Sequence, residues 1–140
     1  MASADLWRRR CRIGLAVFYT VAGILHVFLP APFLSITPAW VPDADDVIFL
    51  TGLCEIAGAI GLLMPPVRRF AGVALALYAV LVFPANIKHA LDSLSGPLVS
   101  PWQWLYHGVR LPLQPVIIWL AGFAGGSVSW PFRRSQNSDA

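Results

Sequence analysis

The feature that most constrains this chain is a long apolar run that holds a single carboxylate. Residues 51–64 read TGLCEIAGAIGLLM, so Glu55 is the only charged residue before the run ends at Pro65 and Pro66. A lone charge in a membrane-spanning helix is costly, and such a residue usually faces a bundle interior or a water-filled cavity. The sequence therefore predicts that other helices supply partners for Glu55.

Similar apolar runs recur along the whole chain. Of the 140 residues, 57% are hydrophobic and 12% are charged, whereas a soluble domain carries about 25% charged residues. The apolar residues come in continuous runs, which is typical of helices in lipid. We expect an all-α, membrane-embedded four-helix bundle, a single domain over 1–140 with spans at about 13–29, 47–64, 70–91 and 104–123. The lipid bilayer is then the expected partner of the chain. The net charge of +3 does not indicate binding to nucleic acid.

Local signals set the ends of these spans. Asp45 or Asp46 is a candidate N-cap for the second span. The first apolar run follows a basic flank, as in a signal peptide, but it is long and no small-residue cleavage site follows it. We therefore expect it to stay as the first span.

Cys11 and Cys54 fall at different depths, so they are not expected to form a disulfide.

The distribution of arginine predicts the orientation. With four spans, one side of the membrane collects eight arginines, while the first loop on the other side holds three aspartates and no basic residue. Basic residues concentrate in cytoplasmic loops, so both termini are predicted to be cytoplasmic. The arginines are Arg8, Arg9, Arg10, Arg12, Arg68, Arg69, Arg133 and Arg134.

Each predicted span places a polar group in the half of the membrane away from these arginines. At about 1.5 Å per helical residue, Glu55 lies about 12 Å below that face and Arg110 about 9 Å below it. His26 and Asn86 lie roughly 10 Å and roughly 6 Å from the same face, and Gln114 is one helical turn beyond Arg110. One shared cavity explains this better than coincidence, so the candidate polar cluster is His26, Glu55, Asn86, Arg110 and Gln114.

Two interpretations of the cluster stay open. In the first, Glu55 and Arg110 form the charged pair of a pocket for a small polar or quinone-like ligand, and His26 and Asn86 add hydrogen bonds. In the second, the same residues form a structural network that fixes helix order and satisfies backbone carbonyls, such as the Val80 carbonyl released by Pro84. The structural interpretation is favoured for His26 and Gln114.

The remaining polar residues are weaker candidates. Lys88 is expected to extend to the membrane interface, and His89 and His107 are interpreted as interfacial. Trp102, Trp104 and Tyr106 are typical membrane anchors. Haem held by His26 and His89 is disfavoured because apolar helix ends often carry an isolated histidine and nothing in the sequence fixes this pairing. A metal held by His26 and Glu55 is disfavoured because too few ligands are in view. No metal site and no cofactor are evident, although quinone is compatible with the cluster.

Four blocks of the chain resemble the DoxX-like family of small membrane proteins. They are GILHVFLPAPFLSITPAWVP, TGLCEIAGAIGLLMPPVRRFAG, VFPANIKHAL and RLPLQPVIIW, and they follow one another from about Gly23 to Trp119. The resemblance implies a multi-pass, four-helix protein of the bacterial inner membrane. It also implies a link to redox complexes, since the family takes its name from a subunit of a thiosulfate:quinone oxidoreductase. It assigns no catalytic role to any residue here.

Three functions follow as expectations. The first is a non-catalytic accessory protein or subunit of a redox-linked membrane complex, with another membrane subunit as a partner. The second is a quinone-interacting oxidoreductase component that uses Glu55, Arg110 and His26. The third is a structural or chaperone-like bundle for another membrane protein. The chain lacks motifs for flavin, haem or iron–sulfur binding, which favours the non-enzymatic alternatives.

Overall fold

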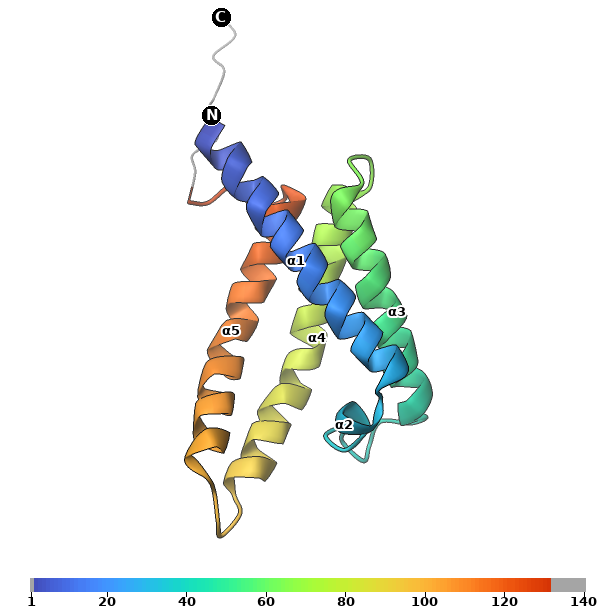
Figure 1. Ribbon diagram of the computed structural model, residues 1–140, viewed down its shortest axis with the longest axis vertical. Helices are drawn as coiled ribbons and strands as arrows, with labels where there is room; N and C mark the ends of the chain where they lie inside the picture. Colours follow the sequence, from blue (N-terminus) through green and yellow to red (C-terminus); the bar gives the residue numbers. More distant parts are fainter. Residues whose placement is uncertain (1, 132–140) are drawn as a thin grey trace, which may run out of the picture.

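The computed structural model describes residues 2–131, with side chains from Asp5 onward, and it is all-α (Figure 1). Four helices are long and apolar enough to cross a membrane, which confirms the predicted class of an all-α bundle. Arg133 and Arg134, two of the arginines used for the orientation, lie outside the described residues. The helices are α1 (Ala2–Phe28), the short α2 (Ala31–Leu34), α3 (Ala44–Leu63), α4 (Arg68–Leu94) and α5 (Pro101–Gly125).

The helices extend beyond most of the predicted spans. Helix α1 includes the arginine flank before Ile13, and α5 begins at Pro101 rather than near Trp104. Apolar composition marks only the part of a helix that suits hydrocarbon, and backbone hydrogen bonding continues through polar flanks. Ser100 caps α5, because its side chain accepts from the Gln103 N–H while the Gln103 side chain accepts from the Ser100 N–H.

The predicted N-cap of α3 is wrong. Asp43 occupies that position with a left-handed φ of 45°, and Asp45 and Asp46 lie in the first turn. Aspartate tolerates this backbone region better than most residues. The carboxylates of Asp45 and Asp46 still favour this helix end, because the exposed N–H groups give it a partial positive charge.

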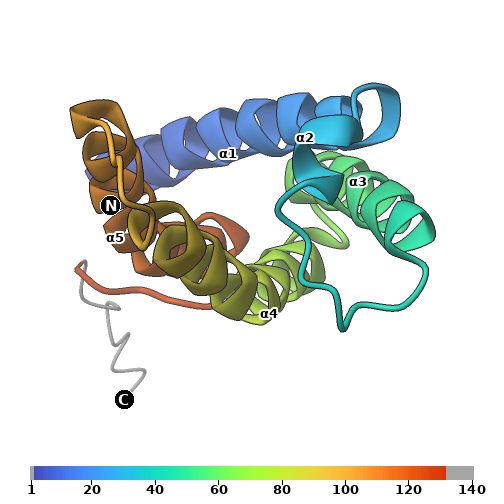
Figure 2. The ribbon, with the colours of Figure 1, turned by 90° about the horizontal axis from the view of Figure 1, so that it is seen from below.

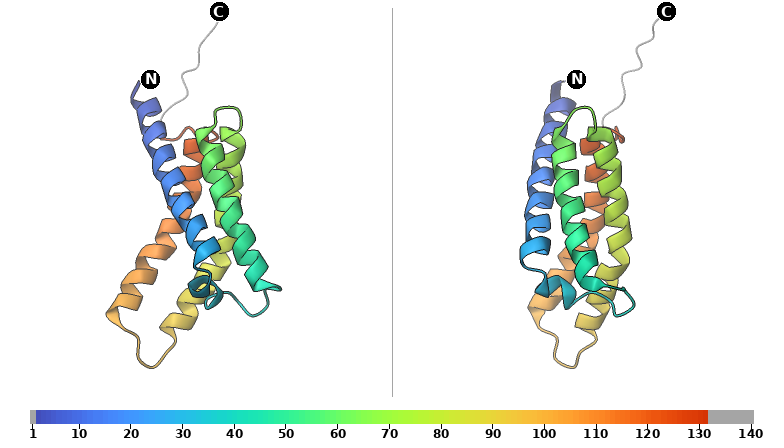
Figure 3. Two further views of the ribbon diagram at one scale, coloured as in Figure 1. Left: turned by 45° about the vertical axis from the view of Figure 1, so that its right-hand side comes forward. Right: turned by 90° about the vertical axis from the view of Figure 1, so that its right-hand side faces the viewer.

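The four long helices form two pairs, which lie close together at one end of the bundle and diverge at the other (Figure 3). We call these the tight end and the splayed end. Helix α1 packs mainly on α3, and α4 packs mainly on α5, while α1 and α5 contact each other much less. At the tight end, α4 and α5 meet at Gly72 and Gly125, where a Cβ on Gly72 would lie 2.7 Å from the Gly125 Cα. Small residues thus allow close helix contact, as they do in membrane bundles.

Glycines of α3 bring this helix against both of its neighbours. A Cβ on Gly52 would lie 2.9 Å from the Gly23 carbonyl oxygen of α1, and one on Gly61 would lie 2.8 Å from Ala71 of α4. A side chain at either position would meet the neighbouring helix, so glycine permits this close approach. Helix α3 therefore joins the two pairs, since it packs on α1 and on α4.

Arginine side chains close the tight end of the bundle. Arg12 donates from Nε and from Nη2 to the Ala124 carbonyl, each at 3.2 Å, near the end of α5. Arg8 donates to the Val128 carbonyl and lies over the Phe123 ring, while Arg68 donates to the Leu62 carbonyl at the end of α3. Carbonyls at a helix C-terminus lack helical partners, so cations are favourable there.

The segment between α1 and α3 partly covers the splayed end. Figure 2 looks at this end and shows α2 and the following loop passing from α1 across to α3. Residues 35–39 of the loop and residues 88–93 near the end of α4 line one shallow pocket, so the loop also reaches α4. The apolar core is instead centred towards the tight end, around Leu15, Leu62 and Leu75.

Candidate functional site

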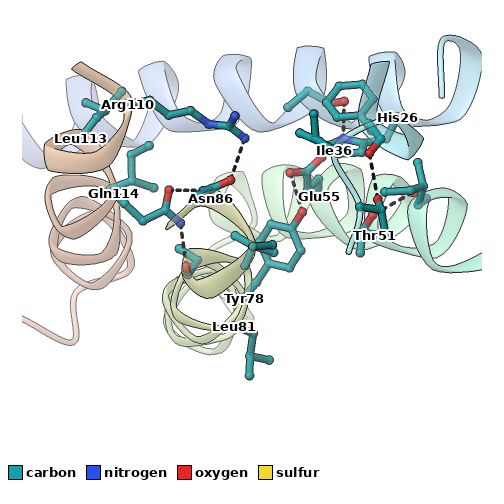
Figure 4. A pocket seen from close by; sticks show the side chains of 18 of the residues that line it. His26, Ile36, Thr51, Glu55, Tyr78, Leu81, Asn86, Arg110, Leu113 and Gln114 are labelled. Atoms are coloured by element: carbon teal, nitrogen blue, oxygen red, sulfur yellow. Dashed lines mark hydrogen bonds and ion pairs between the residues drawn. The ribbon is translucent and has the colours of Figure 1, made fainter. Parts of the chain in front are cut away.

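A cavity of about 710 Å³ lies between the two helix pairs, towards the splayed end. All four long helices and the loop after α2 contribute to its wall. Small-molecule sites usually measure about 300–1,000 Å³ and combine an apolar lining with a few polar groups. Figure 4 shows that polar side chains from different helices point into this space. The five residues of the predicted cluster all line it: His26, Glu55, Asn86, Arg110 and Gln114.

One wall carries a group that we call the carboxylate cluster, formed by Glu55, His26 and Tyr78. Glu55 is 4% exposed, and its Oε2 lies 2.9 Å from Nδ1 of His26. Tyr78 donates its hydroxyl to Oε1 of Glu55 at 2.9 Å. The partners come from α1 and α4, so Glu55 connects three helices. Tyr78 thus satisfies Oε1, whereas the buried Oε2 has His26 as its ion-pair partner and accepts no hydrogen bond from the described residues.

The contacts of His26 define the position of its proton. Its Nδ1 lies 2.9 Å from the Ala22 carbonyl as well as near Glu55. A carbonyl only accepts, so Nδ1 carries a hydrogen and donates it to the Ala22 carbonyl, with Oε2 of Glu55 close beside it. The ring also stacks on Phe33 of α2, with centroids 3.8 Å apart. This contact joins the covering segment to the carboxylate cluster.

The opposite wall carries what we call the guanidinium cluster: Arg110, Asn86, Gln114, His89 and Tyr106. Arg110 donates from Nη2 to Oδ1 of Asn86 at 2.7 Å and from Nη1 to the Tyr106 hydroxyl at 2.8 Å. Its Nη1 also lies 3.0 Å from Nδ1 of His89. A guanidinium has no acceptor, so Nδ1 of His89 is the unprotonated nitrogen of a neutral ring.

The chain of hydrogen bonds continues from Asn86 into the backbone of α4. Asn86 donates to Oε1 of Gln114 at 3.0 Å, and Gln114 donates to the Ala79 carbonyl at 2.6 Å. A released carbonyl near Pro84 was predicted at Val80, whereas the side-chain bond is made to Ala79, one residue earlier. The network thus ties α5 to α4 one residue before the carbonyl that Pro84 releases.

The predicted charged pair of Glu55 and Arg110 is wrong. The ion pair of Glu55 is with His26, and the hydrogen-bond partners of Arg110 are the neutral residues Asn86, His89 and Tyr106. Depth along each helix had placed the two charges at one level. This depth says nothing about the rotation of each helix about its own axis. In the structure, the rotation directs the two charges towards different walls of the same cavity.

The sequence missed several members of the site. Tyr78 was read as part of an apolar span, although a phenol in such a span needs a partner for its hydroxyl. His107 was interpreted as interfacial, but it is 2% exposed, with its ring centroid 4.8 Å from that of His89. The spacing of Tyr106 and Arg110, four residues apart on α5, was the available signal for their contact.

Other predictions concern cysteines and metals. Cys11 and Cys54 are free, which confirms that they do not pair. Among residues 2–131, no three His, Cys, Asp or Glu residues come together as metal ligands would. His26 and His89 belong to the two different clusters. Each already has a side-chain partner, and this arrangement does not suit a shared haem.

Four apolar helices around a cavity with two polar walls define the class of protein, a bundle with the features of a multi-pass membrane protein. Comparison with protein families then identifies the family of the chain. The chain belongs to a family described as a domain of unknown function (DUF8561), whose model matches residues 15–124. Comparisons with curated proteins and with solved structures gave no match. The matched range includes every residue of both clusters.

Proposed function

We propose that this protein is a non-catalytic membrane subunit or accessory protein that binds a small amphiphilic molecule in its cavity. The observation that carries the proposal is the cavity itself, about 710 Å³ with polar groups concentrated on two facing walls and apolar side chains elsewhere. A purely structural network would bring its polar groups into direct contact, without leaving such a space between them. The carboxylate and guanidinium clusters are then binding groups as well as structural ones.

The cellular setting is part of the same proposal. The four blocks similar to DoxX-like proteins support a place in a redox-linked complex of a bacterial inner membrane. The arginines at the tight end support an orientation with both termini in the cytoplasm, because basic flanks stay on that side. In that orientation the cavity lies in the outer half of the membrane.

A quinone-interacting oxidoreductase component is the second candidate. The observation in its favour is that polar groups stand on two facing walls of the cavity, Glu55 and His26 on one and Arg110 on the other. One carbonyl oxygen of a quinone could accept from the hydrogens that Arg110 has left, with the quinone ring between the two walls. Electron transfer would further require a redox partner in another subunit.

Extraction of the purified protein tests the proposal. The protein is purified in a mild detergent, its visible spectrum is recorded, and bound lipophilic molecules are extracted for mass spectrometry. We expect a colourless protein that carries a stoichiometric amphiphile and co-purifies with another membrane protein. An extractable quinone or a visible chromophore would favour the second candidate.

Two matched variants separate the cavity from the lipid-facing surface. Ala22 lines the cavity, and Ala22→Phe should fill it and abolish ligand retention. Ala57 is exposed on α3 and does not line the cavity, so Ala57→Phe should retain ligand like the wild type. Equal retention by all three proteins would show that the molecule is bound elsewhere, and the proposal would fail.

A further inference from the structure

The positive charge of Arg110 has no anionic partner in the part of the chain that the structure describes. Its guanidinium is half-buried, and its hydrogen-bond partners among residues 5–131 are Asn86, His89 and Tyr106, which are neutral acceptors. The single carboxylate of the cavity, Glu55, is occupied by His26 and Tyr78 on the other wall. A charge at membrane depth is expected to be paired, so the cavity lacks an anion beside Arg110.

The hydrogen-bonding capacity of Arg110 leaves room for that anion. Its three side-chain contacts use both hydrogens of Nη1 and one hydrogen of Nη2. The Nε hydrogen and the other Nη2 hydrogen have no protein acceptor among the described residues. Guanidinium and carboxylate or phosphate groups bind each other through paired, charge-assisted hydrogen bonds. Meanwhile, Asn86 and Tyr106 hold the guanidinium in place from two helices.

The cavity continues from Arg110 along an apolar wall towards the middle of the bundle. Leu113 and Ile117 of α5 face this space from one side, and Phe18 and Ala22 of α1 line it from the other. Leu113 is 42% exposed and Phe18 is 47% exposed. Both therefore remain reachable from outside, on two helices that diverge towards the splayed end (Figure 1). A flexible hydrocarbon chain fits such a lining.

The loop after α2 narrows the approach from the splayed end. Phe33, Ile36 and Trp40 line the outer end of the cavity, on the segment that crosses the splayed end in Figure 2. Entry is then lateral, between α1 and α5, from the hydrocarbon of the membrane. A molecule that enters this way keeps its polar head near the interface and its chain pointing inward, as it does in a lipid leaflet.

We infer that the ligand is an amphiphile with an acidic head group, bound through that group to Arg110 and through its chain to the apolar wall between α1 and α5. The inference rests on the proposed function and specifies its ligand class. Two sources supply this chemistry: a free long-chain carboxylate and an anionic phospholipid.

The test compares acids with matched neutral molecules. The full-length protein is placed in nanodiscs of phosphatidylcholine, and its thermal unfolding midpoint is measured with palmitoleic acid or with methyl palmitoleate. A ligand that binds only the folded state raises this midpoint. We expect the acid to raise it and the ester to have little effect. Nanodiscs that contain phosphatidylglycerol form a second arm, and a shift in that arm alone would identify a phospholipid as the source.

Variants assign the effect to Arg110. Arg110→Gln should weaken the apparent affinity for the acid by at least about tenfold, because a charge-assisted hydrogen-bonded pair is lost. Arg12→Gln is the matched control, since Arg12 bonds the Ala124 carbonyl at the tight end and does not line the cavity. It should lower stability but leave the preference for acid over ester unchanged. Ala22→Phe keeps Arg110 intact and should abolish the shift.

The outcomes separate this inference from the proposed function. If acid and ester raise the midpoint equally, and Ala22→Phe removes both effects, the cavity binds amphiphiles but the acidic head is wrong. If Arg110→Gln binds the acid with wild-type affinity, the assignment of an acidic head group to Arg110 is also wrong. If no amphiphile shifts any variant in either lipid, both the inference and the proposed function fail.

Discussion

At the scale of single residues, the decisive contacts are those around Glu55. Its carboxylate joins α1 through His26 and α4 through Tyr78, so one side chain holds three helices together at the splayed end. The predicted location of Glu55 in a shared cavity with His26, Asn86, Arg110 and Gln114 agrees with the lining of the cavity. The role of the cluster as a binding site stays a prediction.

Tyr78→Phe tests the hydroxyl contact. It removes the donor to Oε1 of Glu55 and leaves a buried carboxylate oxygen without its partner, so we expect a loss of about 1–3 kcal/mol in the free energy of unfolding. Reversible unfolding in mixed micelles measures it. The control is Tyr19→Phe, because the hydroxyl of Tyr19 makes no hydrogen bond within residues 2–131. An equal loss in both variants would mean that removal of a buried hydroxyl, rather than loss of its bond to Glu55, is responsible.

Double-mutant cycles test which charges are coupled. Glu55→Gln and His26→Gln remove two sides of one contact, so their effects on the free energy of unfolding should be non-additive by about 0.5–3 kcal/mol. Glu55→Gln and Arg110→Gln affect different clusters and share no partner, and their effects should add within about 0.5 kcal/mol. Strong coupling of Glu55 to Arg110 would contradict the two-cluster arrangement.

At the scale of helices, close contacts at the tight end set the splay that opens the cavity. Helices α4 and α5 approach each other at Gly72 and Gly125, and arginines of α1 and α4 bond the carboxyl ends of α5 and α3. In the sequence, the arginine run indicates only the orientation of the chain. Its bonds to helix ends show a second, packing role.

Gly72→Ala should disrupt the contact between α4 and α5. The added Cβ would lie 2.7 Å from the Ala121 carbonyl oxygen, a backbone atom that moves only if the helices separate. We expect a loss of about 1–3 kcal/mol in the free energy of unfolding. Gly108→Ala is the matched control, since no atom lies within 4 Å of its Cβ position. This change should be neutral or stabilise the protein by up to about 1 kcal/mol. Similar effects from both variants would argue against tight packing at Gly72.

Arg12→Gln tests the bond to the end of α5. The variant loses the contacts of Nε and Nη2 with the Ala124 carbonyl, and a loss of about 1–2 kcal/mol in the free energy of unfolding is expected. Arg9→Gln removes an exposed arginine of the same flank, with no side-chain hydrogen bond among the described residues, and should change stability by less than about 0.5 kcal/mol. Equal losses would indicate a general charge effect instead of a specific bond.

At the scale of the whole molecule, an even number of spans places both ends of the chain on one side of a membrane. Helix α1 begins and α5 ends at the tight end of the bundle, and the loop between α4 and α5 lies at the splayed end (Figure 1). The proposed orientation makes the tight end cytoplasmic and places the cavity in the outer half.

Reporter fusions test this orientation. A phosphatase that is active only outside the cytoplasm should be inactive when fused after Asp139 and active when inserted near Ser95. A reporter that is active only in the cytoplasm should give the reverse result, because the two positions are separated by an odd number of spans. If both positions report the same side, four spans cannot be correct. Reversed activities would keep the spans but invert the orientation.

The sequence by itself determined the number and approximate limits of the long helices and the shared level of their polar groups. Both properties depend on local composition and on distance along a helix, which a linear chain encodes directly. Only the tertiary structure decided that Glu55 pairs with His26 and Tyr78 while Arg110 faces Asn86 and His89. Pairing depends on the rotation and neighbours of each helix, which arise from contacts between distant glycines and alanines. The same contacts leave a cavity between the two charges.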